Sequence, residues 1–413
     1  MSALRADAAS TAELANDLLD RSPNGPYSQR IRELTEGKKI LVTGAGGSIG
    51  SEIVRQLMTL DPAIVYQLDH DESALHALQL QLDGHGMLDT ESTVLADVRD
   101  QTGMRRTMRD LRPDIVYHAA AHKHLPLLER FPGEGVKTNV LGTRNVVAAA
   151  VEMGVARVIN ISTDKAARPT SVLGTTKRIA EMVVRDYAGH GTRLASVRFG
   201  NVLGSRGSFL DTLSFQVASG GPVTVTHREV TRFFMTIPEA AGLVIEASAM
   251  ADSGETYVLD MGEPVRIVEL VNRFVERSGA SAPELRYTGL RPGEKLHEQL
   301  FDSSEQLTTT ENAHIWTVRA KDTLPDCFAD RVSQLYELAA LGHTEELLCE
   351  LADLLPDDPD GRAEERPSPS RSEPEPSTSS LPYRTANVAS VWRERARALQ
   401  RAAGAAGVVV GVS

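Results

Sequence analysis

Cysteine, aromatic residues and surplus positive charge are all scarce in this 413-residue chain. Its two cysteines, Cys327 and Cys349, are too few for a disulfide framework or a cysteine zinc cluster, and they fit a reducing compartment. Lysine and arginine total 44 against 56 acidic residues, which argues against a broad basic surface for nucleic acid or anionic lipid. The length and the 41% hydrophobic content allow one large domain with appendages.

Long apolar runs are also missing. No stretch approaches the roughly 18 consecutive apolar residues of a membrane-spanning helix, and residues 1–10 contain no apolar segment typical of a signal peptide. These absences predict a soluble, cytoplasmic protein that binds neither nucleic acid nor a membrane.

Strand-like and helix-like segments alternate after a polar N-terminal extension over residues 1–36. The β-branched or apolar runs are Lys39–Thr43, Ala63–Asp69, Thr93–Asp97, Asp114–Ala120, Arg157–Thr163 and Leu194–Asn201. Alternation at this spacing indicates parallel βαβ units with right-handed crossovers. It therefore predicts an α/β fold with a doubly wound parallel Rossmann sheet.

This regularity fades after Asn201, where glycine, proline and polar residues separate shorter elements. We expect residues 37–305 to form the Rossmann domain, with a smaller C-terminal substrate-binding lobe built mainly from 202–305. Three further parts are predicted: a helical segment over 306–355, a disordered linker rich in proline, serine and acidic residues over 356–385, and a tail over 386–413 that is either frayed or a short helix.

The strongest local motif is Thr-Gly-Ala-Gly-Gly-Ser-Ile-Gly at 43–50, between a strand-like run and a helix-like stretch. Glycines permit a tight turn and let the backbone approach a pyrophosphate, whose charge lies at the helix N-terminus. The motif predicts a dinucleotide site that includes Gly44, Gly47, Ser48, Ile49 and Gly50.

Asp69 ends the second strand-like run, where a carboxylate accepts hydrogen bonds from the adenosine ribose hydroxyls. This carboxylate would repel a 2′-phosphate and no arginine adjoins it in the sequence, so NAD is predicted in preference to NADP. Capping of the next helix is the alternative role for Asp69. Asp97 and Val98 follow the third run and are predicted to lie near the adenine.

Five ordered motifs carry a family resemblance. They are His118–His124, Asn160–Lys165, Pro169–Lys177, Arg198–Ser208 and Arg291–Lys295. Over roughly residues 36–305 the chain resembles the UDP-N-acetylglucosamine 4,6-dehydratases of capsular polysaccharide biosynthesis, which are extended short-chain dehydrogenases/reductases. The resemblance implies a tightly held NAD, a nucleotide-diphosphate sugar as substrate and a homo-oligomer.

One departure concerns the Tyr-x-x-x-Lys pattern of the wider superfamily. There the two side chains share a helix face, the lysine holds the nicotinamide ribose, and the tyrosine exchanges a proton with the substrate hydroxyl. Lys177 is present here, but Leu173 occupies the tyrosine position. Because leucine cannot move a proton, Thr163, Asp164 or a bound water must help to remove it.

The resemblance implies oxidation at sugar carbon 4, elimination of water across carbons 5 and 6, and return of the hydride to carbon 6. It makes Asp164 the acid that protonates the leaving hydroxyl and Lys165 the base that removes the carbon-5 proton. Two groups whose surroundings separate their protonation states suit such a step.

Further residues take their expected roles from their motifs. Ala119, Ala120 and Ala121 should lie against the nicotinamide. The expected substrate contacts are Lys123, Asn201, Arg206, Ser208, Arg232 and Arg291, with the last two arginines as candidates to grip the diphosphate. His122 and His124 have no acidic or cysteine ligands nearby in the sequence, so no metal site is predicted.

Two other functions remain open at this point. A nucleotide-sugar epimerase, or a different dehydratase, would use the same transient oxidation at carbon 4. A non-catalytic NAD-sensing protein is the second alternative. The leucine at position 173 supports it, whereas the retained Lys177 and the Thr-Asp-Lys run argue against it.

Overall fold

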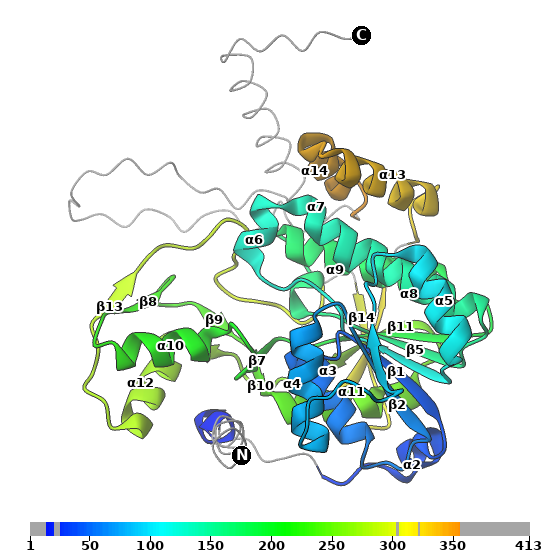
Figure 1. The fold of residues 1–413 in the computed structure, drawn as a ribbon. Helices are drawn as coiled ribbons and strands as arrows, with labels where there is room; N and C mark the ends of the chain where they lie inside the picture. Colours follow the sequence, from blue (N-terminus) through cyan, green and yellow to red (C-terminus); the bar gives the residue numbers. More distant parts are fainter. Residues whose placement is uncertain (1–13, 20–24, 303–304, 321–322, 356–413) are drawn as a thin grey trace.

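A nine-stranded sheet forms the centre of the protein in our computed structural model, which describes residues 14–19, 25–302, 305–320 and 323–355 (Figure 1). The predicted linker over 356–385 and tail over 386–413 lie outside the described residues. The strand order is β14-β15-β11-β6-β5-β4-β1-β2-β3. Their bounds are β1 Lys39–Thr43, β2 Ile64–Asp69, β3 Thr93–Leu95, β4 Ile115–His118, β5 Arg157–Ile161, β6 Arg193–Arg198, β11 Ser253–Leu259, β14 Glu305–Thr309 and β15 Ile315–Ala320.

Seven of these strands, from β3 to β11 in the sheet order, run parallel. This confirms the predicted doubly wound α/β fold. Each of the six predicted runs contains a strand of the sheet, although several strands are shorter than expected. The last predicted run divides at Phe199 and Gly200 into β6 and the separate strand β7 (Asn201–Leu203).

Helices cover both faces of the sheet (Figure 1). Ile40 and Val42 of β1 point into a core with α3 (Ser48–Leu57) and α11 (Ile237–Met250), whereas Leu41 points into the opposite core. The period of two along a strand explains this division. The helices on the second face are α5 (Gln101–Leu111), α8 (Thr143–Glu152) and α9 (Val172–Asp186), while α2 (Gln29–Thr35) joins the first and α4 (Glu72–Asp83) follows β2.

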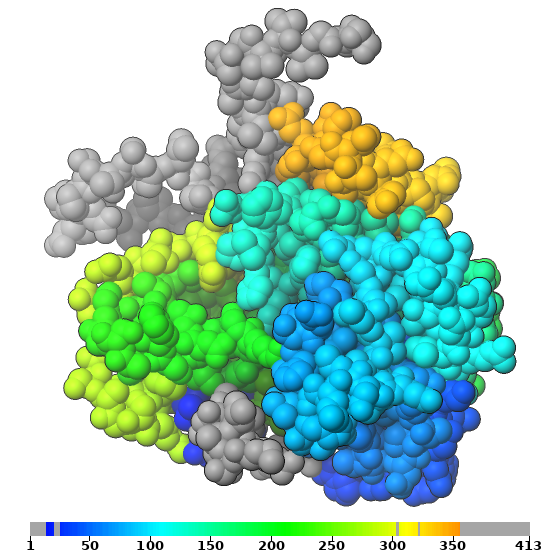
Figure 2. Space-filling view, viewed as in Figure 1, coloured from blue at the N-terminus to red at the C-terminus, as the bar shows by residue number. Residues whose placement is uncertain are grey.

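A second lobe has its own apolar core. Its elements are β7, α10 (Phe209–Ala218), β8 (Val223–Val225), β9 (Thr231–Arg232), β10 (Phe234–Thr236), β12 (Val265–Arg266), α12 (Ile267–Ser278) and β13 (Leu285–Tyr287). Figure 2 shows this lobe, in green to yellow-green, beside the blue and cyan atoms of the sheet domain. Ala15 and Leu18 of the described N-terminal segment, which is helical over 14–19, pack into the same core.

The segment expected to be helical over 306–355 begins instead with strands. β15 pairs antiparallel with β11, and β14 pairs antiparallel with β15, so this hairpin extends the sheet edge. Pairing with β11 is a contact between segments far apart in the sequence, which a local pattern does not display. Helices α13 (Phe328–Leu341) and α14 (Thr344–Asp353) follow and cover the apolar surface of α9.

No helix among the described residues is both long and apolar enough to span a membrane.

Candidate functional site

The glycine motif forms a turn in which backbone packs on backbone. Gly44 has a φ of +67°, and a Cβ there would lie 2.6 Å from the Ala120 nitrogen. A Cβ on Gly50 would lie 2.1 Å from the Gly44 carbonyl oxygen. Gly47 is the N-cap of α3 and supplies no side-chain cap. The first N–H groups of α3 are therefore left for an anionic group, as at a pyrophosphate site.

Asp69 lies beneath this turn at the carboxyl end of β2. Its Oδ2 accepts a hydrogen bond from the Gly46 nitrogen at 2.9 Å, and its Oδ1 accepts one from the Asp71 nitrogen at 3.1 Å. Asp71, and not Asp69, caps α4 by accepting hydrogen bonds from the nitrogens of Ser73 and Ala74. The buried Asp69 carboxylate is therefore directed to the glycine turn, not to the helix.

Asp97 and Val98 follow β3 at the same edge of the sheet. Arg99 donates from Nε to Asp97 Oδ2 at 2.9 Å. Although partial burial opposes the effect, this pairing holds the pKa of Asp97 below its usual range. Val98 is buried, and its carbonyl oxygen accepts a hydrogen bond from Asn145 of α8. The carboxylate of Asp97 is thus already engaged by its own turn.

His118 ends β4 between two threonines. Its Nδ1 lies 2.7 Å from Thr43 Oγ1, and its Nε2 lies 3.0 Å from Thr143 Oγ1. Burial, together with the nearby charge of Lys177, lowers the pKa of His118 to about 3, so the ring is neutral at pH 7. Ala119, Ala120 and Ala121 follow this ring, and the Ala120 backbone packs closely against Gly44.

Asn139 fixes the loop after these alanines, and sequence reasoning missed it. Its Oδ1 accepts from the His122 nitrogen at 2.8 Å, and its Nδ2 donates to the His122 carbonyl oxygen and to Thr176 Oγ1 of α9. Asn139 is fully buried in a π-helical segment, Val136–Gly142, a geometry frequent at functional sites. The sequence signal that could have indicated Asn139 is an amide side chain among the apolar residues of this helical segment.

Asp164 and Lys165 form a charge pair that is largely buried. β5 ends at Ile161, and Thr163 begins a short 3₁₀ turn that contains both residues. Lys165 Nζ donates to Asp164 Oδ1 at 2.9 Å and to Asn201 Oδ1 at 3.1 Å. Thr163 Oγ1 also donates to Asp164 Oδ1, at 2.9 Å. Asp164 Oδ2 is buried and has no hydrogen-bond partner among the described residues, which leaves one oxygen for a ligand.

Lys165 is a charged donor in this arrangement. Burial alone would lower the pKa of its amine, but Asp164 and Glu298 outweigh burial and raise it. Glu298 Oε1 lies 3.8 Å from Lys165 Nζ. A function as a base therefore requires that Lys165 first pass its proton on, and Asp164 Oδ1 is within hydrogen-bond distance to receive it.

Lys177 occupies the first half of α9, which begins at Val172 because Ser171 Oγ accepts a hydrogen bond from the Gly174 nitrogen. Its amine is buried, and burial, partly offset by Glu181, lowers the pKa of Lys177 to about 8. Leu173 lies one helical turn earlier and packs in the apolar cluster beneath α13. Lys177 lies close enough to His118 for its charge to help lower the pKa of that histidine, and position 173 carries only an apolar side chain.

The loop after β7 joins the glycine turn. The Arg206 nitrogen donates to Ser48 Oγ at 3.0 Å, and Lys123 Nζ donates to the Arg206 carbonyl oxygen at 2.8 Å. The hydroxyl of Ser208 is buried without a hydrogen-bond partner among the described residues. Of the predicted contacts, Asn201 thus reaches Lys165, and the Lys123 side chain and the Arg206 backbone join this loop to the glycine turn.

Arg232 and Arg291 are both bound to Glu294. Arg232 Nη2 donates to Glu294 Oε1 at 2.8 Å, while Arg291 Nε donates to Glu294 Oε2 at 3.1 Å. Arg232 is buried, and its Nη1 donates to the carbonyl oxygens of Thr231 and Leu296. Arg291 is exposed and retains donors, so of the two predicted diphosphate ligands it is the more available.

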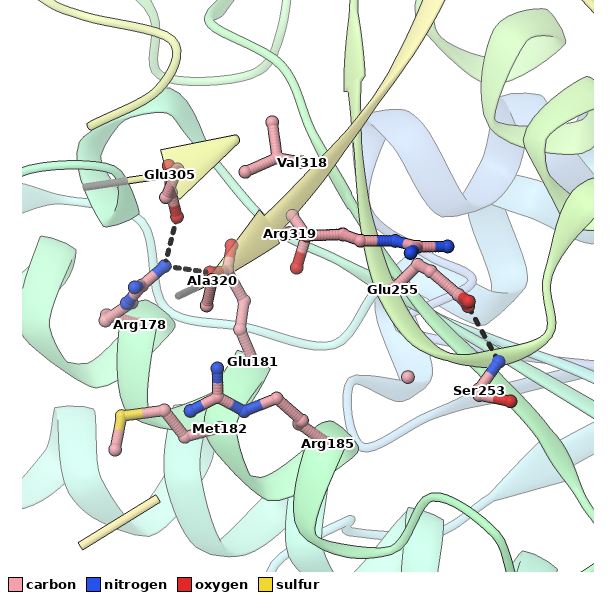
Figure 3. A pocket seen from close by; sticks show the side chains of 12 residues that line it. Arg178, Glu181, Met182, Arg185, Ser253, Glu255, Glu305, Val318, Arg319 and Ala320 are labelled. Atoms are coloured by element: carbon pink, nitrogen blue, oxygen red, sulfur yellow. Dashed lines mark hydrogen bonds and ion pairs between the residues drawn. The ribbon is translucent and has the colours of Figure 1, made fainter. Parts of the chain in front are cut away.

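A buried ion cluster, which sequence reasoning also missed, lies beside the end of β5. Arg198 of β6 forms paired hydrogen bonds to Glu181 of α9 and to Glu305 of β14, and Ser162 Oγ donates to Glu181 at 2.6 Å. Figure 3 shows Arg178 between Glu305 and Glu181 at the wall of a pocket of about 210 Å³. The cluster ties α9 and the added hairpin to the residue before Thr163.

No group of three or more histidine, cysteine, aspartate or glutamate side chains suited to a metal ion occurs in the described part of the chain.

The chain belongs to the polysaccharide biosynthesis protein family. The model of the polysaccharide biosynthesis protein family matches residues 40–320. The probable polysaccharide biosynthesis protein EpsC of Bacillus subtilis (strain 168) is 47% identical over 295 residues, which cover 70% of this chain and 49% of that protein. The capsular polysaccharide biosynthesis protein CapD of Staphylococcus aureus is 48% identical over 295 residues, which also cover 70% of this chain and 49% of that protein. The chain thus spans about half the length of these relatives.

Solved structures give the same fold. Pen from Bacillus thuringiensis superposes with a TM-score of 0.63 at 30% identity, covering 69% of this chain and 89% of that one. DesIV, a dTDP-glucose 4,6-dehydratase from Streptomyces venezuelae, superposes with a TM-score of 0.57 at 24% identity, covering 63% and 87%. The second likeness shows the Rossmann fold alone.

Proposed function

We propose that the protein is an NAD-dependent nucleotide-sugar 4,6-dehydratase acting on a UDP-N-acetylglucosamine-type substrate. The observation that carries this proposal is the buried hydrogen bond between Asp164 and Lys165, beside an unpartnered carboxylate oxygen. Elimination needs an acid and a base at one place, and this pair offers both. The family and the relatives named for polysaccharide biosynthesis support a sugar substrate.

The residues at the carboxyl edge of the sheet fit NAD. Backbone atoms lie so close to Gly44 and Gly50 that neither position has room for a side chain. This matches a turn whose backbone approaches a pyrophosphate closely. Asp69 would accept the adenosine ribose hydroxyls, and Lys177 would hold the nicotinamide ribose. When bound, NAD supplies a reversible hydride acceptor for sugar carbon 4.

The residues of the chain then divide the elimination between them. Lys165 transfers its proton to Asp164 Oδ1, which leaves a neutral amine and a carboxylic acid 2.9 Å apart. The amine removes the carbon-5 proton, and the acid protonates the hydroxyl that leaves carbon 6 as water. Asn201 orients the amine through its hydrogen bond to Nζ.

Removal of the carbon-4 hydroxyl proton requires a substitute for the missing tyrosine. Thr163 Oγ1 already donates to Asp164 Oδ1, so a proton accepted by Thr163 has a path to this carboxylate. Asp164 must release that proton to water before it accepts the proton of Lys165, because one carboxylate holds one proton. We propose that Thr163, with Asp164, performs this step in place of Leu173.

The test is turnover of a panel of UDP-, GDP- and dTDP-sugars in deuterium oxide. We expect a product lighter by one water, with solvent deuterium at carbon 5 and none at carbon 6, because the base exchanges with solvent and the hydride does not. NMR and mass spectrometry read both positions. Absence of turnover and exchange with every sugar would favour a non-catalytic, NAD-binding protein.

Epimerisation is the second candidate, and a relative supports it. The UDP-glucose 4-epimerase of Rickettsia felis is 31% identical over 276 residues, which cover 65% of this chain and 79% of that protein. An epimerase would use the same oxidation at carbon 4 but would leave the product mass unchanged. The buried Asp164–Lys165 pair favours dehydration because epimerisation at carbon 4 has no leaving hydroxyl to protonate.

A further inference from the structure

The Asp164–Lys165 pair continues into two further buried charges. Lys165 Nζ lies 3.8 Å from Glu298 Oε1, and Lys295 Nζ lies 3.5 Å from Glu298 Oε2. The four side chains therefore form a row of alternating charge, two carboxylates and two amines. Side chains that are 0% to 18% exposed make up this row, so solvent screens it poorly.

Two atoms of the outer pair lack hydrogen-bond partners in the described part of the chain. They are Glu298 Oε2 and Lys295 Nζ, both buried. At 3.5 Å from one another they attract, but they do not satisfy each other as a close pair would. Glu298 is thus shared between two amines, and it lies between them without being fully engaged by either.

We propose that Glu298 is a positioning residue that holds the Lys165 ammonium beside Asp164, and that Lys295 weakens this hold by attracting the same carboxylate. The inference rests on the proposed roles of Asp164 and Lys165. Glu298 makes Lys165 a stronger base once it is neutral, but it also keeps a larger fraction of the amine protonated. Lys295 acts in the opposite sense.

The charges that face Lys165 come from three parts of the fold. Asp164 adjoins it, Glu298 and Lys295 lie on the segment before β14, and Arg232 approaches from β9. Arg232 and Lys295 repel the ammonium, whereas the two carboxylates attract it. Asp164 and Glu298 prevail, since the pKa of Lys165 is raised, while burial lowers that of Lys295.

Competitive acetylation of the full chain by trace acetic anhydride tests the inference without turnover. Only a neutral amine reacts, so the labelling rate of Lys165 relative to exposed Lys39, read by peptide mass spectrometry between pH 8 and 9.5, reports its neutral fraction. Glu298→Gln should raise that relative rate about tenfold, the effect of one pKa unit from a lost neighbouring charge. Lys295→Met should lower the rate by a smaller factor.

Shifts of opposite sign are the decisive outcome, because a general loosening of the site would raise labelling in both variants. Glu298→Asp should fall between wild type and Glu298→Gln, and the exposed control Glu263→Gln should change nothing. Equal labelling rates of Lys165 in wild type and Glu298→Gln would overturn the inference. Faster labelling in both Glu298→Gln and Lys295→Met would also overturn it. In turnover, Glu298→Gln should shift the acid limb of carbon-5 exchange to lower pH. If labelling shifts as expected but no sugar turns over, the proposed function fails and the charge row stands.

Discussion

The two halves of the site are made in opposite ways. The half that we propose to bind the dinucleotide depends on the absence of side chains at Gly44 and Gly50, where a Cβ would meet backbone. The chemical half depends on buried charges, above all Asp164 and Lys165, whose properties follow from their neighbours. A steric site should fail abruptly when an atom is added. An electrostatic site should fail by degrees and respond to pH.

Gly50→Ala should produce the largest effect. The added Cβ would lie 2.1 Å from the Gly44 carbonyl oxygen, so the turn must open. We expect undetectable NAD binding by calorimetry and a loss of stability of about 1–3 kcal/mol or more. Gly221→Ala is the matched control, because nothing lies within 4 Å of its Cβ position. NAD affinity equal to wild type in Gly50→Ala would remove the steric account.

Asp164→Asn should abolish most turnover while leaving NAD affinity unchanged. An amide cannot protonate the leaving hydroxyl, and general acid catalysis is worth about 10²–10⁴-fold in rate. Rapid-mixing absorbance should show that NADH forms more slowly than in the wild type, because Asp164 also helps to remove the carbon-4 hydroxyl proton, and that it then accumulates because elimination is slowed further. A parallel loss of NAD affinity would mean that Asp164 supports the cofactor half of the site instead.

The sequence predicted the half built on glycine and the strand pattern well. The alternating apolar runs predicted β1 to β6, and the crossover rule predicted their parallel arrangement, which the pairing of these strands confirms. β11 and the β14–β15 hairpin were missed, because their place in the sheet depends on pairing with strands distant in the chain. Local periodicity carries no information on such partners.

The charged half was predicted only in its motif residues. Asp164 and Lys165 are adjacent in the sequence, but Glu298 lies far along the chain, so its contact with Lys165 depends on the fold. Arg232 shows the converse. Its motif suggested a phosphate ligand, whereas the structure engages its guanidinium with Glu294 and two carbonyl oxygens. Motifs identify residue types, and contacts decide their partners.

His118→Gln should make the free energy of unfolding fall less steeply as the pH is lowered into the mildly acidic range. The pKa of His118 is about 3 when folded and about 6.5 in an unfolded chain, so the unfolded state binds the proton first. Stability is therefore complete above pH 6.5 and falls as the pH drops toward 3, by about 1.4 kcal/mol per pH unit for one proton. Urea unfolding at pH 7, 6 and 5 measures the slope. The exposed control His85→Gln should keep the wild-type slope, and an unchanged slope in His118→Gln would refute a neutral buried ring.

Asp69→Ala should narrow or reverse the preference for NAD over NADP. The carboxylate would accept ribose hydroxyls and repel a 2′-phosphate, and a hydrogen bond to a charged group contributes about 1.5–3 kcal/mol, or roughly tenfold or more in affinity. Asp69→Asn removes the charge but keeps the shape of the side chain, because an amide oxygen can still accept the hydrogen bond from the Gly46 nitrogen. Titration calorimetry with both cofactors measures the ratio. Tighter NADP binding by the wild type would contradict the assignment.

Leu173→Met should have the smallest effect on turnover, because the leucine side chain has no group that can take part in proton transfer. Leu173 is buried in the apolar cluster under α13, and a swap of similar volume there costs less than about 1.5 kcal/mol. Turnover should stay within a few-fold of wild type. Lys177→Ala, one turn along α9, should instead cripple turnover by removing the amine that we propose holds the nicotinamide ribose. Because both side chains are buried on the same helix, thermal unfolding of the two variants controls for packing damage. If both variants lost turnover to a similar extent at similar stability, position 173 would take part in the chemistry. Leu173 would then belong with the residues of the proposed active site and not with its apolar support.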